Sequence, residues 1–90
     1  MLFMVIEHFD QARVKDVYRR FAERGRMAPE GLRYVDSWIT ADFGRCFQLM
    51  ECEDVTLLQQ WVLQWGDLAE FEIVPVAHSK DVAAAVKPIL

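Results

Sequence analysis

The sequence contains few cysteines, histidines, prolines and glycines. Its 90 residues include two cysteines, two histidines, three prolines and four glycines. No His/Cys pair has metal-ligand spacing and no strand carries alternating carboxylates, so we expect neither a metal site nor a cofactor. No stretch forms a repeat, a low-complexity segment or a linker, and this length accommodates one domain.

The two cysteines, Cys46 and Cys52, lie six residues apart in one expected strand. At about 3.3 Å per residue their separation is roughly 20 Å, which is too far for a mutual disulfide. Two thiols that cannot pair indicate a reducing compartment. The apolar start, residues 1–6, is too short to span a membrane and has no basic region before it, so we expect no signal peptide. These features predict a cytoplasmic protein.

Positive charge is also scarce, with ten Lys and Arg against fourteen Asp and Glu, a net charge of −4. This balance argues against a nucleic-acid or anionic-membrane partner.

Apolar residues, in contrast, make up 53% of the chain. A domain of this size buries only roughly 60–65% of its unfolded surface. We therefore expect a second copy of the chain to cover the remaining apolar surface in a homodimer.

The residue pattern predicts the order strand, helix, strand, strand, helix, strand. The expected strands are residues 2–9, 32–40, 45–52 and 70–77, and Asp10 and Asp54 are the expected N-caps of the two helices. This order is the split βαβ arrangement of the ferredoxin-like α+β fold, a four-stranded antiparallel sheet with two helices on one face. We expect residues 1–78 to form this domain and residues 79–90 to form a short helical tail.

The loop between the two middle strands sets which side chains share a face of the sheet. We expect a three-residue loop, Asp42-Phe43-Gly44, with Gly44 left-handed and Ala41 paired with Arg45. The side chains expected to face the helices are Met4, Ile6, Val35, Ser37, Ile39, Phe47, Leu49, Glu51, Phe71 and Ile73. The other face would hold Phe3, Val5, Glu7, Tyr34, Asp36, Trp38, Cys46, Gln48, Met50, Cys52, Glu72 and Val74. An even-numbered loop would bury Asp36 under the helices, which is unfavourable.

Three stretches of the chain resemble a family of small bacterial proteins of unknown function. They are residues 1–9 (MLFMVIEHF), 29–38 (PEGLRYVDSW) and 46–52 (CFQLMEC). The family looks like part of the dimeric α/β-barrel group of ferredoxin-like folds, so the resemblance implies the fold and a homodimer. It implies no reaction, because that group includes cofactor-free monooxygenases, haem-handling enzymes, small-acid isomerases and amino-acid-sensing domains.

The polar and aromatic side chains expected on the second face are the candidate site. Glu7 is the candidate catalytic acid or base, because enclosure raises the pKa of a carboxyl group. The candidate ligand-binding residues, two aromatic walls and the polar groups beside them, are Tyr34, Trp38, Asp36, Arg45 and Gln48. They predict a small-molecule binding domain or a cofactor-free enzyme. The alternative is a non-catalytic homodimer, structural or regulatory, in which the same residues form the interface.

A second candidate location for a cavity is the loop of residues 25–31, which contains two glycines and could close as a lid. Four arginines lie near it, Arg19, Arg20, Arg24 and Arg26. They either hold an anionic substrate or complement the dipole of the preceding helix. Trp61 and Trp65, four residues apart on the second helix, are expected in the core.

Overall fold

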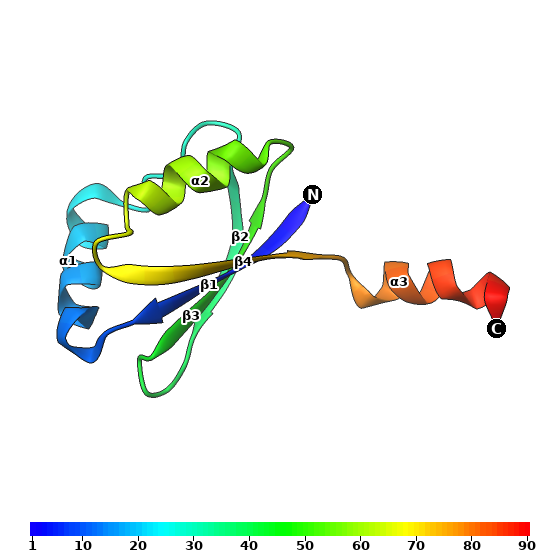
Figure 1. Ribbon diagram of the computed structural model, residues 1–90, viewed down its shortest axis with the longest axis horizontal. Coiled ribbons are helices and arrows are strands. Elements are labelled where there is room, and N and C mark those ends of the chain that lie inside the picture. The colour runs from blue at the N-terminus through cyan, green and yellow to red at the C-terminus, as the bar shows by residue number, and fades with distance from the viewer.

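The computed structural model describes all 90 residues and contains a four-stranded antiparallel sheet with two helices on one face (Figure 1). The strands are β1 (Leu2–Phe9), β2 (Arg33–Ile39), β3 (Arg45–Glu51) and β4 (Ala69–Val76), in the spatial order β2-β3-β1-β4. The helices are α1 (Val14–Arg24), α2 (Val55–Leu63) and the tail helix α3 (Ser79–Val86), with short 3-10 turns at Gln11–Arg13 and Lys87–Ile89. The predicted ferredoxin-like α+β fold is confirmed.

The ends of the helices are fixed by the residues that the sequence indicated. The side chain of Asp10 accepts a hydrogen bond from the Ala12 N–H at 3.1 Å, and Asp54 accepts one from Thr56 at 2.9 Å. Both bonds satisfy N–H groups that have no partner within the first turn. Gly25 ends α1 with a φ of 68°, a left-handed conformation that costs glycine little.

The hydrophobic core lies between the sheet and α2. Leu58 and Trp61 of α2 are almost completely buried, with exposed fractions of 0% and 1%. The core cluster comprises Phe3, Val5, Val17, Leu32, Met50, Cys52, Leu58, Trp61, Trp65 and Leu68. In contrast, α1 contributes only Val17 to it, and Tyr18 and Phe21 of the same helix are about half exposed.

The hairpin between β2 and β3 differs from the expected one. Thr40 pairs with Arg45 through a 2.9 Å backbone bond, so the loop has four residues, 41–44. Phe43, with a φ of 61°, takes the left-handed position that was predicted for Gly44. The Asp42 carboxylate stabilises this loop by accepting bonds from the Gly44 N–H and the Thr40 hydroxyl.

The longer loop changes which residues of the two strands share a face. Ser37 lies opposite Gln48 and Ile39 opposite Cys46, in place of the expected partners Leu49 and Phe47. Because side chains alternate, this one-residue slip reverses the predicted faces of β3 and of its neighbour β1. The side chains of these two strands that face the helices are Phe3, Val5, Glu7, Cys46, Gln48 and Met50, all of which are buried, as is Cys52 directly after β3.

The faces of β2 and β4 agree with the prediction in most positions. Phe71 and Ile73 pack against the core. An irregularity between Tyr34 and Asp36 shifts the register of β2 by one residue. It brings Tyr34 to the helix side, opposite Met50. Asp36 lies opposite Leu49 on the other face, because the faces of β3 are reversed, so the even-numbered loop does not bury Asp36.

The face of the sheet away from α1 and α2 carries no covering element; we call it the open face. It holds apolar side chains from all four strands, Leu2, Met4, Ile6, Trp38, Phe47, Leu49 and Val74. The helix α3 projects away from the sheet (Figure 1), and none of its residues is buried. No helix of the chain is long and apolar enough to cross a membrane.

Gly31 supplies a test of how tightly the loop before β2 is packed. It has a φ of 92°, and a Cβ there would lie 3.0 Å from the Leu57 Cδ1 atom of α2. We expect Gly31→Ala to lower the free energy of unfolding by at least about 1 kcal/mol, because strain and the close approach add. Gly66→Ala is the control, since its Cβ would meet only the Val62 carbonyl oxygen at 3.4 Å. Urea denaturation that gives equal losses for both variants would contradict this packing.

Candidate functional site

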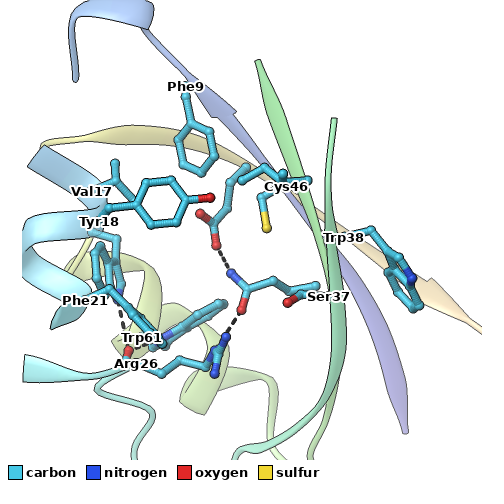
Figure 2. Close-up of a pocket in the computed structure, with 13 residues that line it drawn as sticks. Phe9, Val17, Tyr18, Phe21, Arg26, Ser37, Trp38, Cys46 and Trp61 are labelled. Atoms are coloured by element: carbon cyan, nitrogen blue, oxygen red, sulfur yellow. Dashed lines mark hydrogen bonds between the residues drawn. The ribbon is translucent and has the colours of Figure 1, made fainter. Parts of the chain in front are cut away.

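A pocket of about 300 Å³ lies between α1 and the helix-facing side of the sheet (Figure 2). Aromatic rings form much of its wall. The residues that line it are Glu7, Phe9, Val17, Tyr18, Phe21, Arg26, Ser37, Trp38, Ile39, Cys46, Gln48, Trp61 and Trp65. A cavity of this size and apolar character is typical of a site for a small organic molecule.

Glu7 is the acidic group of this pocket. It projects from the middle of the sheet, on β1, and its exposed fraction is 6%. Burial disfavours the charged form and raises the pKa of Glu7 to about 7, against an opposing effect of the Gln48 hydrogen bond and the Arg26 charge. A carboxyl group with this pKa is partly protonated near neutral pH and can donate or accept a proton.

Gln48 connects Glu7 to Arg26. Its side-chain amide donates to the Oε1 atom of Glu7, and its carbonyl oxygen accepts from the Nε atom of Arg26 at 2.9 Å (Figure 2). Because a guanidinium group can only donate, the second bond fixes the orientation of the amide. The amide N–H therefore points to the carboxyl group of Glu7.

Arg26 is held by its own backbone and by two aromatic rings. Its carbonyl oxygen accepts hydrogen bonds from two indoles, that of Trp61 on α2 at 2.8 Å and that of Trp65 just after α2 at 3.1 Å. Its guanidinium carbon lies 3.6 Å from the centre of the Tyr34 ring and 5.2 Å from that of Phe21. These contacts combine hydrogen bonds with cation–π attraction, so the loop is fixed in place over the pocket.

Two further ionisable groups line the pocket, Tyr18 of α1 and Cys46 of β3. Burial, with the charge of Glu7 as a smaller contribution, raises the pKa of the Cys46 thiol to about 12. The pKa of Tyr18 is raised from its ordinary value by burial, Cys46 and Glu7. Both groups are therefore neutral at physiological pH, and a Cys46 thiol with this pKa is a poor nucleophile.

The structure divides the six candidate site residues between the two faces of the sheet. Glu7 and Gln48 line the pocket, and Tyr34 lies beside it under the Arg26 guanidinium. Asp36, Trp38 and Arg45 lie on the open face, although Trp38 borders the pocket. Figure 2 shows the Trp38 indole on the opposite side of β2 from the other labelled rings. The expectation that five of them, all but Arg45, lie together on the face away from the helices was wrong because of the hairpin register.

Several pocket residues were not among those candidates. Tyr18 and Phe21 belong to the apolar stripe of α1, and nothing in the residue pattern indicates that this stripe lines a cavity. Arg26 was noted only as one of four arginines near the loop. Arg26 is distinguished by two tryptophans, Trp61 on α2 and Trp65 just after it, whose indole N–H groups both need an acceptor.

The remaining charged groups do not form a second site of this kind. Arg20 makes a bidentate ion pair with Asp67 at 2.7 and 2.6 Å, which lowers the pKa of Asp67 to about 2. His8 contacts Glu72 on the open face at 2.6 Å. No group of three or more His, Cys, Asp or Glu side chains is arranged to hold a metal ion.

Comparison with known proteins yields one match. The whole chain, residues 1–90, matches the family model of a domain of unknown function, DUF3303. No curated protein and no solved structure matches the chain.

The burial of Glu7 predicts a specific dependence of stability on pH. Its pKa rises from 4.5 to about 7 on folding, a difference worth about 3 kcal/mol. The stability that this group contributes is fully present below pH 4.5 and is lost as the pH rises through 7. Relative to Glu7→Gln, which cannot ionise, the wild-type free energy of unfolding should fall by about 3 kcal/mol between pH 4.5 and 8.5. Urea denaturation curves that stay parallel across this range would show that Glu7 is not buried as described.

Proposed function

The chain belongs to the DUF3303 family, and for this member we propose that it binds a small organic molecule in the pocket beside Glu7. Glu7 would be the proton donor or acceptor, so the domain is either a binding module or a cofactor-free enzyme. The observation that carries this proposal is a nearly buried carboxyl group, with a pKa of about 7, at a pocket of about 300 Å³. Proton transfer by such a group is a common contribution to catalysis.

The chemistry of the other lining residues supports a bound molecule more than a structural role. A carboxyl group buried only for packing would be unfavourable compared with an apolar residue of similar size. Glu7 is nevertheless kept in place by Gln48, and Gln48 by Arg26. The aromatic rings of Tyr18 and Phe21 complete the opposite wall and suit a flat molecule.

We further propose that the protein is a homodimer, joined through the open face. The support is the row of apolar side chains there, which includes Leu49 in the middle of β3 and the half-exposed Trp38. A second copy would remove this surface from water. The tail would extend this contact, because α3 and the residues after it expose Val82, Val86, Ile89 and Leu90.

The two unpaired cysteines favour a reducing compartment, and a cytoplasmic location is part of the proposal.

The second candidate function is a dimeric structural or regulatory module without a ligand. The open face favours it, because an extended apolar face is a feature of protein interfaces. In that case Asp36, Trp38 and Arg45 serve only as contacts between the subunits. The two candidates share the dimer and differ in whether the pocket binds a molecule.

A set of small planar probes tests whether the pocket binds a molecule. Phenol, benzamide and benzoate can be titrated into the ¹⁵N-labelled protein while the indole N–H signals are followed by NMR. We expect at least one probe to shift the signals of Trp61 and Trp65, which line the pocket, more than that of Trp38. Cys46→Met, which extends a side chain into the pocket, should weaken this binding at least fivefold, whereas Leu49→Met on the open face should leave it unchanged. Absence of any shift at millimolar probe would refute the proposal.

The homodimer can be tested with one charge on the open face. Leu49→Asp should convert the dimer to a monomer, because two carboxylates would be buried in a symmetric interface. Leu63→Asp is the control, since Leu63 lies on α2 with an exposed fraction of 82%. Sedimentation equilibrium measures the mass, and circular dichroism shows whether the fold is retained. A wild-type chain that sediments as a monomer would contradict the proposal.

A further inference from the structure

Arg26 has hydrogen-bonding capacity that the chain does not use. Its Nε–H bonds to Gln48, whereas its two terminal nitrogens make no hydrogen bond within the chain. The side chain is nevertheless fixed, because its guanidinium group stacks on Tyr34 and its backbone carbonyl is bound by Trp61 and Trp65. A guanidinium group with free N–H donors and little remaining freedom is suited to bind a carboxylate through two parallel bonds.

Glu7 has one carboxyl oxygen committed and one available. Oε1 accepts the bond from Gln48, and Oε2 has no partner within the chain. Every fully buried side-chain oxygen or nitrogen of the chain has a hydrogen-bonding partner. Since Oε2 has none, it is not fully buried, and we infer that it is accessible from the pocket. The pocket therefore contains one titratable group, Glu7, and one permanent cation, Arg26, and the Gln48 amide connects them.

The net charge of the pocket depends on whether Glu7 is protonated. The ionisable groups that face Glu7 are Arg26 from the loop, Tyr18 from α1 and Cys46 from β3. From α2 and the turn after it, the pocket is lined by Trp61 and Trp65, whose side chains do not titrate. Tyr18 and Cys46 are neutral at physiological pH because burial raises both of their pKa values. The pocket thus carries a charge of +1 when Glu7 is protonated and none when Glu7 is ionised.

We propose that the ligand is a small planar organic carboxylate, bound by the free N–H groups of Arg26, and that Glu7 takes up a proton when this anion binds. The proposal rests on the proposed function and specifies its ligand class. The flat body of the ligand packs against Tyr18 and Phe21. An ionised Glu7 would repel the ligand and compete for Arg26, whereas protonated Glu7 leaves the cation free and can donate a hydrogen bond through Oε2.

The matched probes benzoate and benzamide test this proposal, since they share size and shape and differ in charge. Isothermal titration calorimetry of the wild-type protein at pH 6 should show benzoate binding at least tenfold more tightly than benzamide. Between pH 6 and pH 8 the affinity for benzoate should fall by about tenfold, as the protonated fraction of Glu7 falls. Titration in two buffers of different ionisation enthalpy at pH 8 should report uptake of close to one proton per benzoate bound.

Three variants separate the contributions of Arg26 and Glu7 to ligand binding. Arg26→Gln should bind benzoate no more tightly than benzamide, because the cation is lost, and Glu7→Gln should bind benzoate with equal affinity at pH 6 and pH 8. Arg24→Gln removes an exposed arginine outside this pocket and should behave as the wild type. The indole NMR signals of Trp61 and Trp65 show whether each variant retains the loop conformation.

The outcomes distinguish this inference from the proposed function. Benzamide binding as tightly as benzoate would overturn the carboxylate ligand and leave the pocket proposal standing. Benzoate binding that is independent of pH in the wild-type protein would overturn the proton uptake. Binding of none of the planar probes would refute both proposals.

Discussion

The burial of the Glu7 carboxyl group is the constraint on which the site depends. A carboxyl group under the helices is tolerable only if it is protonated or has hydrogen-bonding partners, and Gln48 provides the one partner it has in the chain. Gln48 is oriented by Arg26, and Arg26 is held by the indoles of Trp61 and Trp65. A core helix thus positions a loop, the loop orients an amide, and the amide holds the carboxyl group at the wall of the pocket.

This arrangement gives the two faces of the sheet different roles. The helix-facing side contains the packed core under α2 and the pocket under α1. There is room for a pocket under α1 because this helix contributes only one residue to the core. The open face is the side available to a partner and carries no pocket residue that reaches Glu7. The proposed ligand and the proposed second subunit would therefore occupy opposite faces of the sheet, and a substitution on one face need not disturb the other.

The order, type and approximate bounds of the elements could be predicted, because caps such as Asp10 and Asp54 and the hydrophobic periodicity act locally. The faces of β1 and β3 could not, because both of their faces are apolar and only the hairpin register distinguishes them. That register depends on the four-residue loop, which the Asp42 side chain stabilises. The site was half predicted, since Glu7 was identified but the loop contacts of Arg26 form only in the folded chain.

The measurement that tests this account most directly is the pKa of Glu7 in the folded protein. With ¹³C-labelled glutamate, NMR can follow the carboxyl carbon of Glu7 between pH 3 and 9, and the Glu7→Gln variant identifies its signal. We expect a midpoint near pH 7, because the carboxyl group is desolvated at the wall of the pocket. A midpoint near 4.5 would place Glu7 in water and would contradict the site, whatever the protein binds.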